Sequence, residues 1–93
     1  MRNLIYERDA VYHLAINEGR QMDVYYLKTR FIRDVVTPYI KYVTRSDNIS
    51  VHYAIDVETL DEYVEIVLTD STYYVCITAD SLSSIMTDVM KKF

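Results

Sequence analysis

Five acidic residues lie close together in the second half of the chain, and clustered carboxylates can bind metal ions or transfer protons. They are Asp56, Glu58, Asp61, Glu62 and Glu65. A calcium loop needs a glycine for its sharp turn, and a nuclease-type metal site needs a basic residue that contacts phosphate. This segment has neither, because no Lys or Arg occurs between Arg45 and Lys91 and the one glycine is Gly19. We therefore expect no metal and no other cofactor.

The remaining reactive side chains form no recognisable catalytic pattern. His13 and His52 are far apart in the sequence, and neither has a second His or Cys at metal-ligand spacing. Cys76 is the single cysteine and has no Cys-x-x-Cys partner, so we expect an unreactive thiol. Serines and threonines are plentiful, but none lies in a Gly-x-Ser-x-Gly elbow or a phosphate-binding loop. We therefore expect a protein that is not an enzyme.

Charge is divided unevenly along the chain. The first 45 residues contain eight basic and five acidic residues, whereas residues 46–93 contain two basic and nine acidic residues. The net charge of −4 therefore divides into +3 for the first part and −7 for the second. Such an asymmetry carries information about the partners of a protein rather than about its fold.

The hydrophobic pattern of the first half predicts helices. Apolar residues recur at helical spacing over residues 3–18, and Gly19 follows at the position where a left-handed residue ends a helix. A second amphipathic helix is predicted from Asp23 onward. Pro38 leaves two interpretations for residues 39–45, a continued but kinked helix or a strand. We favour the helix, because the apolar side of the preceding segment continues past the proline.

From Ile49 the hydrophobic period changes to two, which predicts strands over residues 49–57, 63–68 and 72–78. A closing helix is predicted to begin at Asp80 or Ser81. We therefore expect one domain, residues 1–93, with a two-layer α+β fold in the order α-α-β-β-β-α. Its sheet is an antiparallel meander covered on one face by helices. The sheet has three strands, or four if residues 39–45 are extended.

The acidic residues are predicted to gather on a surface of this sheet. Side chains two residues apart on a strand share one face at a spacing of about 6.7 Å, which places Asp56 and Glu58, and likewise Tyr63 and Glu65, on the solvent side of their strands. Turns at the ends of the sheet would present the other acids, and no basic residue of the same segment neutralises them. A merely solvated surface is the alternative. The predicted partner-binding residues are Asp56, Glu58, Asp61, Glu62, Glu65, Asp70, Tyr63 and Tyr74.

The main functional hypothesis is a small binding protein that acts as an inhibitor. Its carboxylates would stand in for phosphates at a basic, nucleic-acid-binding surface of a partner protein. Small size, skewed charge and absent catalytic chemistry resemble the general profile of phage-encoded inhibitors of host nucleases, restriction systems or polymerases. This likeness is one of type and rests on no motif. We also expect a homodimer, because so short a chain gains stability from burying more area.

Two alternatives belong to other classes of protein. Residues 15–28 have some features of a helix-turn-helix, which would turn Arg20, Lys28, Arg30 and Arg33 toward DNA phosphates. The negative net charge argues against direct DNA binding. The ten tyrosines favour a structural or assembly protein that self-associates. A single cysteine and the lack of an apolar segment of membrane-spanning length predict a cytoplasmic protein without a membrane partner.

Overall fold

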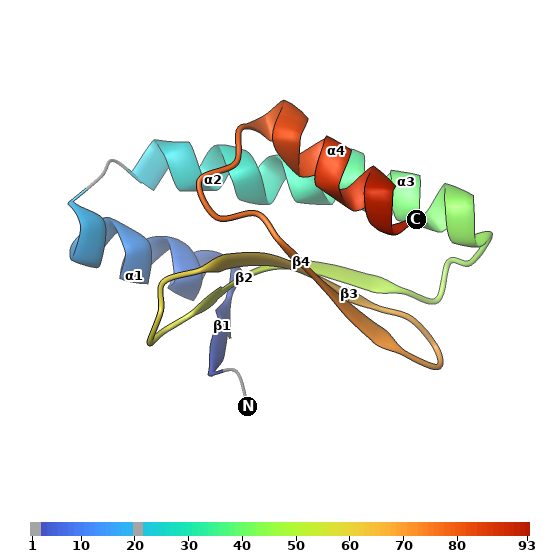
Figure 1. Ribbon diagram of the computed structural model, residues 1–93, viewed down its shortest axis with the longest axis horizontal. Helices are drawn as coiled ribbons and strands as arrows, with labels where there is room; N and C mark the ends of the chain where they lie inside the picture. The colour runs from blue at the N-terminus through green and yellow to red at the C-terminus, as the bar shows by residue number, and fades with distance from the viewer. Residues whose placement is uncertain (1–2, 20–21) are drawn as a thin grey trace.

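Helices cover one face of a four-stranded antiparallel sheet in the computed structural model, which describes residues 3–19 and 22–93 (Figure 1). The strands lie in the order β1-β2-β3-β4, so each strand pairs with its neighbour in the sequence of strands. The predicted α+β fold with an antiparallel meander and helices on one face is confirmed.

Three strands occur where the period-two pattern predicts them. They are β2 (Ser50–Asp56), β3 (Glu62–Val67) and β4 (Thr72–Cys76). Tyr53 of β2 lies opposite Val64 of β3, which in turn lies opposite Val75 of β4. These three side chains are buried against the helices, together with Ile55 and Ile66, which lie two positions away on β2 and β3.

The first strand was not predicted. Leu4–Tyr6 form β1 and pair antiparallel with residues 54–56 of β2, while α1 (Glu7–Glu18) begins only at Glu7. The predicted helix over residues 3–18 is therefore wrong in its first turn, although it ends before Gly19 as expected. Three consecutive apolar residues are compatible with both the helical and the strand periodicity. Pairing with β2, about 50 positions away in the sequence, makes this segment a strand. The fourth strand of the sheet thus comes from the N-terminal region.

A long helical segment continues through the proline. It consists of α2 (Met22–Phe31), the π-helical turn η1 (Ile32–Val36) and α3 (Thr37–Thr44), so residues 39–44 are helical. The backbone N–H of Thr37 donates to the carbonyl of Ile32, whereas in a regular α-helix it would donate to the carbonyl of Arg33. The Thr37 hydroxyl donates to the same Ile32 oxygen at 2.9 Å. This wider turn directly precedes Pro38, whose ring crowds the preceding turn of a regular helix.

The last helix, α4 (Leu82–Lys92), begins after Ser81, whose Oγ accepts a hydrogen bond from the Ser84 N–H at 3.2 Å. It packs beside α2 and α3 on the same side of the sheet (Figure 1). Between the helices and the sheet lies one hydrophobic core. Its largest fully buried side chains are Tyr25, Tyr53, Leu14, Ile32, Ile40, Ile55, Ile66, Ile77 and Ile85.

Gly19 provides a direct test of how α1 ends. Its φ is +66°, and its N–H donates to the carbonyl of Ala15 at 3.0 Å. A Cβ at this position would contact nothing within 4 Å, so a side chain costs only backbone conformational energy. We expect Gly19→Ala to lower the free energy of unfolding by about 1 kcal/mol. Gly19→Asn should cost less, because asparagine tolerates the left-handed region. Urea denaturation measures both variants, and equal losses would contradict this account.

Candidate functional site

The face of the sheet that points away from the helices carries a group of aromatic and polar side chains. We call it the aromatic face; it consists of Tyr6, His52, Tyr63, Glu65 and Tyr74. His52 lies opposite Glu65 on β3, which lies opposite Tyr74 on β4. Tyr6 and Tyr63 lie on either side of Ala54 in the neighbouring row. None of the described helices covers this face, and α2, α3 and α4 lie on the other side of the sheet (Figure 1).

Glu65 occupies the centre of the aromatic face and is only 7 % exposed, although no helix covers it. The hydroxyl of Tyr6 donates a hydrogen bond to Glu65 Oε2 at 2.8 Å. Burial, and secondarily this bond to a carboxylate, raises the pKa of Tyr6 to about 12. The hydroxyl therefore stays protonated at neutral pH and remains a donor. The surrounding side chains thus hold a carboxylate in place on an otherwise open sheet.

His52 connects the aromatic face to the start of α1. The ring of Tyr6 meets the His52 ring edge-on, with 5.9 Å between centroids. Nδ1 of His52 lies 3.1 Å from Oε1 of Glu7, the first residue of α1. These contacts fix the short strand β1 against β2 through side chains as well as through its backbone.

The tyrosines leave part of their rings in solvent. Tyr6 is 39 % exposed and Tyr74 is 36 % exposed, while Tyr63 is half-buried. All three project from strands, so their positions are determined by backbone pairing rather than by loops. Such partly buried rings with polar hydroxyl groups can pack against and hydrogen-bond a partner at low entropic cost.

The structure largely buries three of the six predicted acidic residues. Glu65 and Asp56 do lie on the face away from the helices, but Asp56 is 9 % exposed. Its Oδ1 accepts hydrogen bonds from the N–H groups of Glu58 and Thr59, at 2.8 and 3.3 Å, and so holds the β2–β3 turn. Glu62 is 5 % exposed and belongs to β3 rather than to a turn. The expectation that Asp56, Glu62 and Glu65 are open to solvent is wrong.

Glu62 lies on the helix side of the sheet at the centre of a buried polar network. Lys28 Nζ contacts both of its oxygens, at 2.8 and 3.0 Å. The hydroxyl of Tyr53 donates to Oε1 at 2.6 Å, and the N–H of Ala79 donates to Oε2 at 3.0 Å. Burial, with the neighbouring Glu62 carboxylate, raises the pKa of Tyr53. The network satisfies the buried charge, and it joins α2 to β3 and to the segment before α4.

The remaining predicted acids lie at opposite ends of β3. Glu58 and Asp61 are in the turn before it, and Asp70 is in the turn after it. Glu58 and Asp70 are exposed, and Asp61 is half-buried. The six carboxylates therefore do not form one cluster. What the structure brings together from the predicted set is Tyr63, Glu65 and Tyr74.

The helix-turn-helix alternative loses one of its predicted contacts. Lys28 is buried in the ion pair with Glu62, so its expected position facing DNA phosphates is wrong. Arg20 lies outside the described residues. Arg30 and Arg33 are exposed, and Arg33 forms a surface ion pair of 2.8 Å with Asp34.

The sequence pattern did not predict that Tyr6, His52 and Glu7 belong to one site. The prediction of a helix from residue 3 placed Tyr6 on the wrong element, and nothing in the local pattern connects it to His52. One signal was present, because Glu7 and Asp9 are the kind of acidic residues that occupy the first turn of a helix. A helix start at Glu7 would have left Leu4–Tyr6 free to form a strand.

Comparison with known proteins adds no assignment, because the chain matches no protein-family model, no curated protein and no solved structure. In the described part of the chain, no three His, Cys, Asp or Glu side chains converge as a metal site would require. None of the described helices is long and apolar enough to cross a membrane. The function is therefore argued from the surfaces of the molecule itself.

The buried network around Glu62 predicts a large effect of removing its cation. Lys28→Met leaves the carboxylate of Glu62 buried without a positive partner, and we expect a loss of about 3 kcal/mol in the free energy of unfolding. The double variant Lys28→Met/Glu62→Gln should recover part of this loss, because no uncompensated charge remains. Arg30→Met, at an exposed position of the same helix, is the control and should change little. Urea denaturation at neutral pH would contradict the account if Lys28→Met resembled this control.

Asp80 predicts a dependence of stability on pH. Burial, and then the neighbouring carboxyl of Asp88, raises the pKa of Asp80 from 3.8 to about 6, and its Oδ2 has no hydrogen-bond partner among the described residues. Because the folded state favours the protonated form, the contribution of Asp80 to stability is greatest below about pH 4 and is lost as the pH rises through 6.

Asp80→Asn cannot ionise and should avoid this loss. We expect the free energy of unfolding of this variant, relative to that of the unaltered protein, to rise by about 1 kcal/mol between pH 4 and pH 7, after allowance for partial solvent screening. Asp70→Asn, in an exposed turn, is the control. Unfolding free energies measured at both pH values give the result, and parallel curves for the three proteins would refute it.

Proposed function

We propose that this protein is a non-enzymatic protein-binding domain whose aromatic face is its contact surface. The observation that carries the proposal is the presence of Tyr6, Tyr63 and Tyr74 on the one face of the sheet that no described helix covers. A face built only for solubility has no need of three large rings, whereas tyrosines are enriched in the buried centres of protein interfaces.

The charge around the aromatic face supports a basic partner. Glu58, Asp61 and Asp70 lie at the two ends of the central strand β3, and residues 46–90 contain no Lys or Arg. Complementary charge at the rim of an interface steers encounter and selects among partners more than it adds affinity. A basic nucleic-acid-binding surface would meet this rim, so the inhibitor hypothesis continues here with two exposed carboxylates and one half-buried carboxylate at its edge rather than six exposed ones.

The test is affinity capture from a lysate of the native host with the immobilised protein. We expect a basic partner to be retained, with Tyr74→Ala reducing its recovery at least tenfold. The matched control is Tyr42→Ala, which removes an 82 % exposed tyrosine from α3, on the helix side. Retention should also fall as salt is raised, because rim charges are screened.

Equal capture by the two tyrosine variants, or retention of acidic partners only, would refute the proposal. Self-association through the aromatic face is the competing outcome and would support the predicted homodimer. Light scattering over a concentration series identifies it, because Tyr74→Ala would then convert a dimer into a monomer while Tyr42→Ala would not.

A further inference from the structure

The first strand covers only half of the edge of β2. Its three residues pair with residues 54–56, and the chain then leaves the sheet at Glu7, whose φ is +51°. Residues 50–53 of β2 have no strand partner on this side within the described ranges 3–19 and 22–93. An open strand edge of this kind can pair with another extended chain.

The hydrogen-bonding pattern shows which backbone groups face this open edge. The N–H of Val57 donates toward β1, to the carbonyl of Asn3 at 3.0 Å, whereas the N–H of Asp56 donates toward β3, to Asp61 at 3.0 Å. Because these directions alternate along a strand, the odd-numbered residues of β2 turn their peptide groups toward the β1 side. The N–H and carbonyl of Val51 therefore point to the part of the edge that β1 leaves open.

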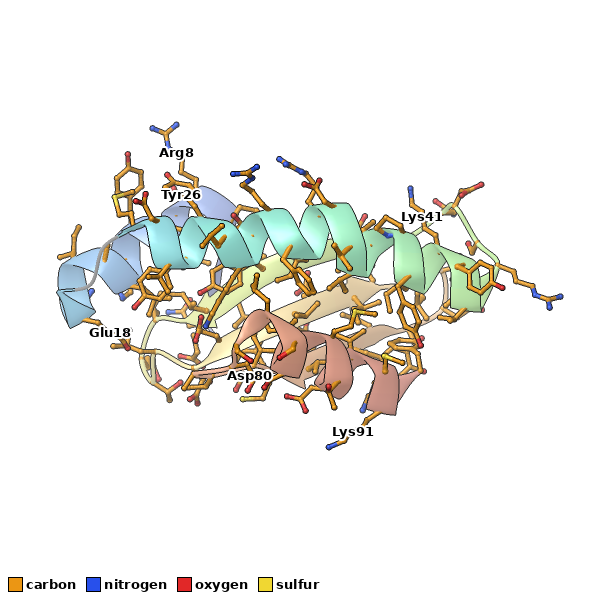
Figure 2. The ribbon with its side chains drawn as sticks, turned by 90° about the horizontal axis from the view of Figure 1, so that it is seen from above. Arg8, Glu18, Tyr26, Lys41, Asp80 and Lys91 are labelled. Atoms are coloured by element: carbon orange, nitrogen blue, oxygen red, sulfur yellow. The ribbon has the colours of Figure 1, made fainter. Side chains whose placement is uncertain are left out.

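A groove of about 380 Å³ lies along this open edge. Ile49 and Val51, both half-buried, contribute apolar surface, and Arg8, Arg33 and Lys41 contribute three cations from α1, η1 and α3. Arg8 and Lys41 project from the same long side of the molecule, opposite the side that carries Lys91 (Figure 2). The one carboxylate among the lining residues is that of Glu7, which contacts His52. Arg33 also pairs with Asp34 at the surface, so three cations stand against two carboxylates here and the groove keeps a net positive charge.

We propose that this groove binds an extended, acidic peptide segment of a partner protein, which adds as a strand to the open edge of β2. Its backbone pairs with Val51, its apolar side chains contact Ile49 and Val51, and its carboxylates meet Arg33 and Lys41. A peptide fits better than a nucleic acid because the backbone groups of the edge need a peptide partner and the groove surface is partly apolar. This surface differs from the aromatic face, so the inference does not depend on the function proposed above.

The experiment uses the full chain, labelled with nitrogen-15, and an eight-residue probe peptide of alternating Glu and Val. Nuclear magnetic resonance titration should shift the amide signals of residues 50–53, and the Val51 amide should exchange more slowly with solvent. A peptide of alternating Lys and Val is the control for charge. A third peptide, N-methylated at every residue, has no backbone N–H to donate along either of its edges and should bind at least tenfold more weakly.

Charge-reversal variants locate the site. Arg33→Glu/Lys41→Glu should weaken binding of the Glu-Val peptide at least tenfold, whereas the matched variant Arg30→Glu/Arg45→Glu changes the net charge equally at exposed positions outside the groove and should bind as before. Retained amide dispersion shows that each variant is folded.

Three results would overturn the inference. One is the absence of shifts at residues 50–53 at millimolar Glu-Val peptide. Another is equal binding of the acidic and basic peptides, or of the methylated and unmethylated ones. The third is a single-stranded oligonucleotide that shifts the same amides while the acidic peptide does not, which would assign the groove to nucleic acid instead.

Discussion

The antiparallel pairing of Leu4–Tyr6 with β2 determines both surfaces described here. It brings Tyr6 onto the open side of the sheet, where its hydroxyl holds Glu65 at the centre of the aromatic face. Because the strand ends at Tyr6, the same pairing leaves the rest of the β2 edge without a partner strand among the described residues. The positive φ of Glu7 turns the chain sharply into α1, so β1 cannot extend further along β2.

Burial of charge is the second constraint on the molecule. An acid-rich sheet would repel itself if all of its carboxylates stood on one surface. The fold instead assigns half of the predicted carboxylates to structural contacts: Glu62 with Lys28 and Tyr53, Glu65 with Tyr6, and Asp56 with the backbone of its own turn. Each of these contacts satisfies a group that would be costly to bury alone. The other three predicted carboxylates lie in turns at the two ends of β3.

The two proposed surfaces have opposite character. The aromatic face is formed by strands in the acidic half of the chain, apart from Tyr6, whereas the edge groove takes its cations from the basic first half. His52 belongs to both, since its ring contacts Tyr6 on one side and its Nδ1 contacts Glu7 in the groove. A partner bound to one surface would therefore lie close to the other. The charge asymmetry of the sequence thus corresponds to two neighbouring surfaces of the folded protein.

The sequence by itself determined the α+β class, the three strands after residue 49, the end of α1 at Gly19 and the helix past Pro38, because these follow from local periodicity and cap chemistry. It also determined the division of charge along the chain. Only the tertiary structure decided that Leu4–Tyr6 form a strand, that Glu62 and Lys28 are buried together, and that β2 keeps an open edge. The physical reason is that these features depend on contacts between residues 34 to about 50 positions apart, where a partner's backbone or charge outweighs the local preference of a few residues.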